Sequence, residues 1–260
     1  MSLRPLISGL LSVIALLLAP ATALSAEFDL DLYAELLEQH TRAVPSTVGT
    51  VVDYRGLRES ADWRRLTEQV GAARPSRLSR PERLSFWINA YNILTIDLVL
   101  EHYPVQSIRK IGSFLFPVWN RDVVTLEGRS LSLGEIEHEI LRKMDEPRIH
   151  AAIVCASTSC PSLARVPFRS DRLDADLDAA MGRWLADPRK GVSIDREKRT
   201  VWVSSIFNWF EADFQAAGGV LQTIAPYLPK EDAAWLREMG QEVRIRYLDY
   251  DWSLNDDPRR

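Results

Sequence analysis

Apolar residues surround almost the whole circumference of one predicted helix, over residues 81–103. They are Leu84, Phe86, Trp87, Ile88, Ala90, Tyr91, Ile93, Leu94, Ile96, Leu98 and Val99. Ser79 and Glu82 form a capping box before it, and Pro81 suits its first turn. Because a helix that is apolar on all sides must be covered on all sides, we expect it in the middle of a domain.

Three polar residues interrupt this helix, and they share one stripe. Ser85, Asn89 and Asn92 follow at intervals of four and three positions, which places them on the same side. Buried amides need hydrogen-bond partners. The two asparagines therefore either bond to neighbouring backbone or line a pocket.

The pattern elsewhere predicts further short helices and strands. Helical spacing covers residues 29–43, 60–73 and 206–217, while paired alternating runs predict hairpins at 123–131 and 192–203 and a last strand at 243–248. This order indicates an α+β fold. We expect the buried central helix to pack on a mainly antiparallel sheet, behind an N-terminal helical lead-in.

A second capping box, formed by Ser132 and Glu135, opens a short helix that ends near Met144. Glu137 lies inside the apolar face of this helix, and His138 lies at its edge. A carboxylate that points toward a core requires a partner. Glu137 is therefore expected either to form a buried ion pair with an arginine such as Arg148 or to belong to a site.

Both cysteines and one of the four histidines lie in residues 148–161, which the pattern predicts to be a strand and the loop that leaves it. The alternation of a strand places His150 and Cys155 on opposite faces. Cys160 lies in the loop, so His150 and Cys160 form the favoured thiol and imidazole pair. Pro161 suits a first helical turn, whose N–H groups would lower a thiol pKa and hold an oxyanion.

Two cysteines in a secreted protein can instead form a disulfide, here between Cys155 and Cys160. A redox-active pair is a further alternative, although the C-x4-C spacing departs from the C-x-x-C of thioredoxin-like proteins. A zinc site would lack the second ligand pair that structural zinc sites have. We therefore expect no metal and no cofactor.

The first 26 residues have the pattern of a secretory signal peptide. Arg4 precedes an apolar run over residues 6–19, and small residues follow at 21–26. The run is shorter than the roughly 18 residues of a membrane span. We expect a mature chain that begins near Glu27, is periplasmic or secreted, and keeps no stable membrane anchor after cleavage.

Charge and length bound the remaining possibilities. The formal net charge is −4, and it becomes −5 without the leader, which contains one arginine. A mildly acidic surface with mixed signs argues against a nucleic acid partner. We expect a helical lead-in over residues 27–78, one domain over 79–255 and a polar tail at 256–260.

Four segments, residues 86–92, 131–138, 148–161 and 250–255, resemble in the same order the family called domain of unknown function 547. The resemblance spans about residues 80–255, and that family has no settled activity. A looser likeness connects the chain to transglutaminase and papain-like cysteine hydrolases, which pack a buried helix on a sheet whose strand begins with the catalytic histidine. Those enzymes carry their cysteine at the start of the helix, where this chain has Leu84, Ser85 and Phe86.

The leading hypothesis is a cysteine-hydrolase-like enzyme for acyl or amide bonds. In it Cys160 is the nucleophile, His150 is the base, and Glu137 or Asn89 orients the histidine. Further residues expected to bind an unknown small molecule or peptide are Asn92, Ser85, His138, Arg148 and Ser159. The alternative is a non-enzymatic periplasmic binding or interaction module with a structural Cys155–Cys160 disulfide, and the third hypothesis is a thiol oxidoreductase.

Overall fold

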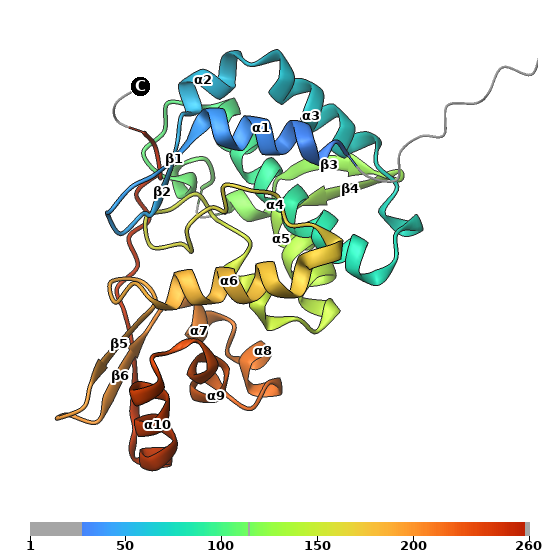
Figure 1. Cartoon of the computed structure of the whole chain (residues 1–260). Coiled ribbons are helices and arrows are strands. Elements are labelled where there is room, and N and C mark those ends of the chain that lie inside the picture. Colours follow the sequence, from blue (N-terminus) through green and yellow to red (C-terminus); the bar gives the residue numbers. More distant parts are fainter. Residues whose placement is uncertain (1–27, 114, 258–260) are drawn as a thin grey trace, which may run out of the picture.

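The computed structural model describes residues 28–113 and 115–257, and the predicted signal peptide lies outside them. The α-helices are α1 (Leu30–His40), α2 (Tyr54–Glu59), α3 (Ala61–Ala72), α4 (Arg80–His102), α5 (Leu133–Glu135), α6 (Leu173–Leu185), α7 (Ile206–Trp209), α8 (Glu211–Ala216), α9 (Val220–Ile224) and α10 (Lys230–Met239). The strands are β1 (Thr41–Ala43), β2 (Thr50–Val52), β3 (Asp122–Leu126), β4 (Arg129–Ser132), β5 (Val192–Asp195), β6 (Thr200–Val203) and β7 (Arg244–Tyr247). Helices dominate, and α4 runs through their centre (Figure 1).

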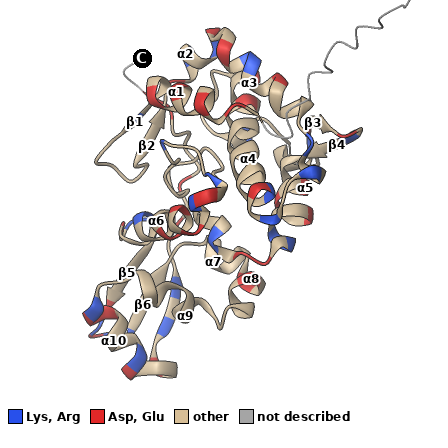
Figure 2. Cartoon of the chain, turned by 45° about the vertical axis from the view of Figure 1, so that its right-hand side comes forward, with Lys and Arg blue, Asp and Glu red and all other residues tan. Residues whose placement is uncertain are grey.

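Helix α4 is the buried helix that the sequence predicts. Its capping box is formed, since the Ser79 N–H donates to Glu82 Oε2 at 2.8 Å. Its buried residues extend from Leu84 to Leu100, and its charged residues lie mainly near its two ends (Figure 2). Asp97 is an exception, and its carboxylate accepts a hydrogen bond from Trp63 Nε1 at 2.9 Å. Within the described ranges, no helix is both long enough and apolar enough to cross a bilayer.

The strands confirm the α+β class but form three small sheets. The pairs β1–β2 and β3–β4 are antiparallel, and in the third sheet β6 pairs antiparallel with β5 and parallel with β7. The lead-in thus contains a hairpin besides its helices. Strands of three to five residues cannot cover a helix of 23 residues. Helix α4 therefore contacts β3 but is covered mainly by α2, α3 and the helical turns after α5.

The segment after β7 (residues 248–257) returns along the molecule and joins its two ends. Figure 1 shows it in dark red, running from the region of β5 and β6 toward β1 and β2. It forms isolated bridges between Leu254 and Ser157 and between Asp256 and Val52. The buried Asn255 accepts a hydrogen bond from the Tyr54 hydroxyl at 2.7 Å. This segment therefore binds the lead-in to the region of the cysteines.

The predicted strand over residues 148–155 is wrong. A 3-10 helix (η6, Pro147–Ala151) stands in its place, and an irregular loop follows. Asn92 of α4 supplies the bonds that a neighbouring strand would give: its Nδ2 donates to Ala152 O at 2.9 Å, and its Oδ1 accepts from Val154 N–H at 2.8 Å. Because this one buried amide satisfies backbone groups of the segment, its apolar alternation does not require a β-sheet.

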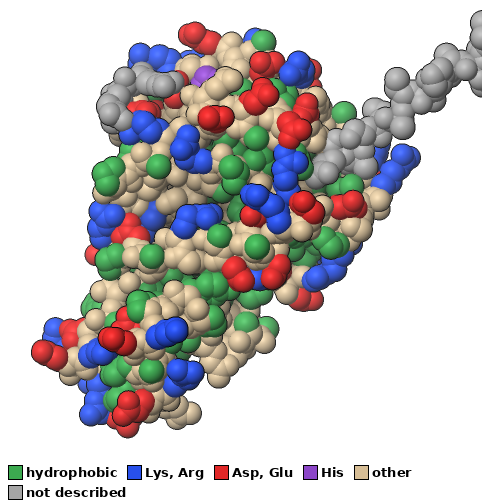
Figure 3. All heavy atoms as spheres, in the orientation of Figure 1, with side chains coloured by type: hydrophobic (Ala, Val, Ile, Leu, Met, Phe, Trp, Pro, Cys, Tyr) green, Lys and Arg blue, Asp and Glu red, His purple; other side chains and the backbone are tan. Residues whose placement is uncertain are grey.

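The helical turn predicted at Pro161 is also wrong, because residues 161–169 form a loop. The backbone there turns toward Lys190, whose ammonium group bonds Cys160 O at 2.9 Å and Ser162 Oγ at 3.1 Å. On the face seen in Figure 3, acidic and basic side chains are interspersed.

Candidate functional site

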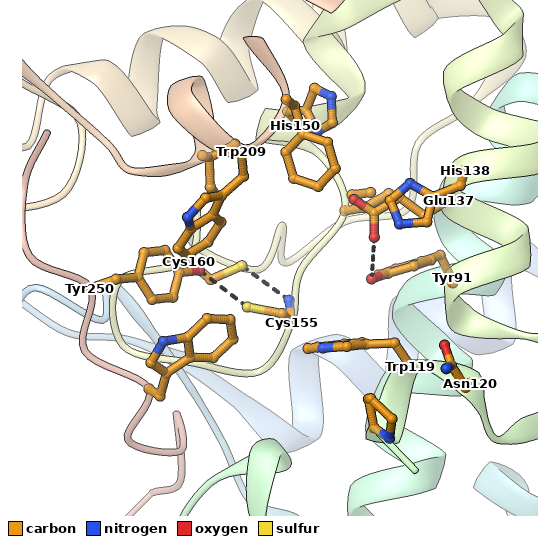
Figure 4. A pocket seen from close by; sticks show the side chains of 16 residues that line it. Tyr91, Trp119, Asn120, Glu137, His138, His150, Cys155, Cys160, Trp209 and Tyr250 are labelled. Carbon is orange, nitrogen blue, oxygen red and sulfur yellow. Dashed lines mark hydrogen bonds between the residues drawn. The ribbon is translucent and has the colours of Figure 1, made fainter. Parts of the chain in front are cut away.

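One cavity of about 330 Å³ brings the cysteines, two histidines and Glu137 together. It is lined by Tyr91, Pro117, Trp119, Asn120, Gly134, Glu137, His138, His150, Ile153, Cys155, Cys160, Ile206, Trp209, Phe210, Tyr250 and Trp252. In Figure 4 the two sulfur atoms lie close together on one side, and Glu137 with Tyr91 lies on the other. A cavity with many aromatic residues and a few convergent polar groups is the usual form of a small-molecule site.

The thiol loop (residues 152–160) forms one wall of this cavity and is held in place from several sides. Besides the two bonds from Asn92, the Thr158 N–H donates to Ser253 O at 2.8 Å and the Asp251 N–H donates to Ser159 Oγ at 2.9 Å. Ala156 is buried and has a φ of 57°, a left-handed conformation that costs a residue with a Cβ free energy. Such a backbone persists only because its surroundings fix it.

Lys190 supports the loop from behind. Its side chain is buried, with 2% of the residue exposed, and besides Cys160 O and Ser162 Oγ its ammonium donates to Val48 O at 3.0 Å. Burial lowers the pKa of Lys190 to about 8. No sequence signal pointed to this residue, since it lies 30 positions beyond Cys160 and outside every motif.

The two cysteines are adjacent free thiols, so the structure contains no Cys155–Cys160 disulfide. The Cys155 N–H donates to Cys160 Sγ at 3.0 Å, and Cys155 Sγ lies 3.0 Å from Ser157 Oγ and 3.2 Å from the Tyr250 hydroxyl. Burial raises the pKa of Cys155, but hydrogen bonds from Cys160, Ser157 and Tyr250 outweigh it and lower the value to about 7. Burial raises the pKa of Cys160 well above its usual range. The acidic thiol is therefore Cys155, whereas the sequence favoured Cys160.

His150 does not form the predicted pair with Cys160. Its Nε2 lies 2.8 Å from Asp213 Oδ2, its ring stacks on Phe210 at 4.3 Å between centroids, and within the described residues no hydrogen bond joins it to either thiol. Burial lowers the pKa of His150, so the imidazole is mainly neutral near pH 7. Arg142 also holds Asp213, with bonds of 2.7 and 2.8 Å. Burial alone would raise the pKa of Asp213, but its hydrogen bonds with His150 and Arg142 hold that pKa well below its usual range.

Glu137 faces the cavity from a π-helical turn (Ile136–Leu141) that continues α5. The Tyr91 hydroxyl donates to its Oε2 at 3.1 Å (Figure 4). Burial raises the pKa of Glu137 to about 7 despite this bond. The ion pair with Arg148 is absent, since that arginine binds Glu146, Asp174 and Asp178. A carboxyl group with this pKa can both donate and accept a proton near neutrality.

The central part of the chain matches a known protein family. Residues 75–185 match the family model described as "Protein of unknown function, DUF547". This segment is a DUF547 domain. It contains α4, Glu137, His150 and both cysteines, whereas Asp213 and Tyr250 lie beyond it. No curated protein and no solved structure matches the chain, so the likeness to transglutaminase and papain-like hydrolases stays a prediction.

Several predicted residues of the DUF547 domain have structural contacts instead. Asn89 bonds the backbone of Phe168, donating to its oxygen at 2.7 Å and accepting from its N–H at 3.0 Å, so it does not orient His150. The Ser85 hydroxyl donates to Glu82 O at 3.0 Å. Asn92, Arg148 and Ser159 likewise do not line the cavity, and His138 does, with its Nδ1 3.0 Å from Arg142 Nη1.

Sequence reasoning missed two groups that lie beyond the DUF547 domain and contact its site residues. Tyr250 contacts the acidic thiol, and its position in the family-like segment 250–255 did not reveal this role. Asp213 lies 63 residues from its partner His150, and no motif surrounds it. Trp209 and Trp252 stack at 5.6 Å between centroids and line the cavity. Trp209 is 45% exposed and Trp252 is half-buried.

Proposed function

We propose that this protein is a thiol-dependent hydrolase in which Cys155 attacks an acyl or amide carbon. The observation that carries the proposal is the pairing, across one cavity, of a thiol and a carboxyl group whose pKa values both lie at about 7. Near pH 7 the Cys155 thiol is partly thiolate and needs no separate base to become a nucleophile. The carboxyl group is partly protonated and can act as an acid.

The reaction proceeds in two steps. The Cys155 thiolate adds to the carbonyl carbon, and the bond to the leaving amine or alkoxide breaks as that group takes the proton of Glu137. Water then attacks the thioester, the Glu137 carboxylate accepts its proton, and the thiolate leaves with the acid product released. Tyr250, which lies 3.2 Å from Cys155 Sγ, stabilises the free thiolate at the start and at the end.

His150 serves as a positioning residue in this scheme. Its bond to Asp213 and its stacking on Phe210 fix the wall of the cavity next to Glu137. The substrate class is a small molecule or peptide with an acyl or amide bond, since the cavity is of small-molecule size. In keeping with the leader-like pattern of residues 1–26, we place this activity outside the cytoplasm.

The test uses p-nitrophenyl acetate, an activated ester that acylates reactive thiols. The wild type should release a burst of about one nitrophenolate per chain and gain one acetyl group in its intact mass, located on the peptide with Cys155. Cys155→Ser should abolish the burst, while Cys160→Ala should retain it with an apparent pKa higher than that of the wild type. Acylation that survives Cys155→Ser, or that requires Cys160 instead, would contradict the proposal.

A dithiol oxidoreductase is the second candidate, because the two thiols contact each other and their pKa values shift in opposite directions. An acidic attacking thiol beside a buried resolving thiol is the arrangement that disulfide exchange uses. Cys155 would attack a substrate disulfide, and Cys160 would then displace the mixed disulfide. Multiple turnover with a model disulfide and glutathione that is lost in Cys160→Ala would favour this candidate over the hydrolase.

A further inference from the structure

The loop between α4 and β3 carries the most exposed large hydrophobic residues of the described chain. Leu115 is 78% exposed and Phe116 is 74% exposed, and the two are consecutive. Single exposed apolar residues are common on proteins, but an adjacent pair of this exposure is more unusual. We call these two residues the apolar tip.

The shape of the loop holds the tip outward. The Ser113 N–H donates to Phe116 O at 2.9 Å, and the Phe116 N–H donates to Ser113 Oγ at 3.1 Å. Gly112 at the base leaves no room for a side chain, since a Cβ there would lie 2.4 Å from Val118 N. These bonds tie Phe116 to Ser113, so ordering Phe116 against a partner would cost little conformational entropy.

The same loop leads directly into the wall of the cavity. Pro117, Trp119 and Asn120 line it, and Trp119 lies 6.5 Å from Trp252 between ring centroids. The tip therefore directly precedes, in the chain, a segment that forms part of the wall of the cavity with Cys155.

Cations surround the base of the loop. Arg109 and Lys110 precede it and are exposed, with the Arg109 guanidinium 5.0 Å from the ring centre of Trp252. Arg121 follows it and donates to Ile111 O at 3.3 Å, and next to it in the chain is the acidic Asp122. Within residues 109–122 three cations stand against one acid, whereas the protein as a whole has a net charge of −4.

We propose that the apolar tip docks this protein on an anionic lipid membrane, with the mouth of the cavity at the lipid surface. Projecting apolar side chains, tryptophans at the level of the headgroups and flanking Arg and Lys are the combination that peripheral binding to such a surface needs. The local basic charge on an acidic protein orients this side toward the membrane. The binding does not depend on the chemistry of Cys155.

Sedimentation with vesicles tests the proposal. Full-length mature protein is mixed with vesicles of phosphatidylcholine alone or with 30% phosphatidylglycerol, on the order of the anionic content that attracts basic segments. The wild type should sediment with the anionic vesicles and lose binding in high salt. Leu115→Ser with Phe116→Ser should reduce the partition coefficient at least about tenfold. Arg109→Gln with Lys110→Gln should reduce it by about fivefold per charge, with little effect on the neutral vesicles.

Matched controls separate these effects from misfolding. Val166→Ser removes another exposed apolar side chain, 55% exposed, and should bind as the wild type does. Cys155→Ser should also bind normally, which keeps this result independent of the proposed hydrolase. A wild type that stays in the supernatant with both vesicle types overturns the proposal. So does a tip variant that changes the oligomeric state in gel filtration without changing vesicle binding, since the tip would then contact a second copy.

Discussion

The thiol loop and the loop that follows it (residues 161–169) are both irregular, and both are fastened to α4 by the same device. Asn92 bonds the backbone of the thiol loop with two hydrogen bonds, and Asn89, three residues earlier on the helix, bonds the backbone of the second loop at Phe168 with two more. Both amides are buried. The chemistry of the two contacts is the same, yet only the thiol loop lines the cavity of the candidate site.

The comparison shows that a buried polar stripe on a helix does not reveal a site by itself. Each asparagine satisfies backbone groups that would otherwise be unpaired in the core. The two loops differ in the residues that they carry. The first presents the two cysteines to the cavity, and the second buries the Phe168 ring. The structural and functional interpretations of such residues can therefore both hold for Asn92, which fixes the loop of the two cysteines without lining the cavity itself.

The largest expected effects come from removing these two amides separately. Asn92→Ala and Asn89→Ala should each lower the free energy of unfolding by about 2 to 4 kcal/mol, because each leaves one buried carbonyl and one buried N–H unpaired. Urea denaturation measures this. Only Asn92→Ala should also slow the alkylation of Cys155 by iodoacetamide, by about tenfold or more. An equal slowing in Asn89→Ala would erase the distinction between the two loops.

Lys190 joins the two loops, so its loss should affect both. Lys190→Met leaves Cys160 O, Ser162 Oγ and Val48 O without this donor, and we expect a loss of about 1 to 3 kcal/mol in the free energy of unfolding. Part of that loss is offset, because a buried ammonium is itself costly. Hydrogen exchange of the amides in both loops should rise together in this variant. Protection lost in only one loop would show that Lys190 does not connect them.

Glu137 lines the same cavity as the thiol loop, whereas no residue of the second loop lines it, so the titration of Glu137 tests the thiol loop's side of the comparison. The folded protein holds its proton up to about pH 7, whereas the unfolded chain releases it near 4.5. The contribution of Glu137 to stability is therefore complete below pH 4.5 and declines as the pH rises to 7, by about 3 kcal/mol.

The difference in unfolding free energy between wild type and Glu137→Gln, measured from pH 4.5 to 7.5, isolates this change from the opposite contribution of His150. Burial lowers the pKa of that histidine, so its contribution rises with pH. Glu139→Gln, on the solvent side of the same turn, serves as the control and should show no such decline relative to wild type. A flat difference for Glu137→Gln would mean that this carboxyl group is ionised throughout the range.

The smallest expected effects concern the backbone of each loop. Ala156→Gly should leave stability unchanged or raise it by up to about 1 kcal/mol, because glycine adopts a φ of 57° without strain. Ala164→Gly, in the second loop, should lower stability by about 0.5 to 1 kcal/mol, since nothing there favours glycine. Thermal unfolding measures both. Destabilisation by both substitutions to the same extent would mean that the left-handed residue stores no strain.

Elements that local periodicity defines could be predicted from the sequence. Helix α4 with its capping box, the hairpin around Glu127 and Gly128 and the inward direction of Glu137 all depend on neighbours within a few residues. The strand predicted from Arg148 to Cys155 was wrong because the apolar alternation is the same whether a neighbouring strand or a side-chain amide bonds the backbone. That error also placed Cys155 away from the site and favoured Cys160.

The rest depends on contacts between distant positions. Asp213 meets His150 across 63 residues, and Tyr250 meets Cys155 across 95. No spacing rule connects such pairs, because the fold alone decides which segments meet. Glu137, His138, His150 and both cysteines could therefore be named from the sequence, whereas their distant partners Asp213 and Tyr250 could not.

The returning segment after β7 also has a consequence for how the protein is made. Synthesis proceeds from the N-terminus, so Cys155 leaves the ribosome long before Tyr250 exists to hydrogen-bond its sulfur. Until residues 250–255 settle beside the thiol loop, Cys155 lacks the bond that helps to make it acidic. The nascent chain thus carries a thiol with an ordinary pKa, and Cys155 gains its contact with Tyr250 only when the last part of the fold closes.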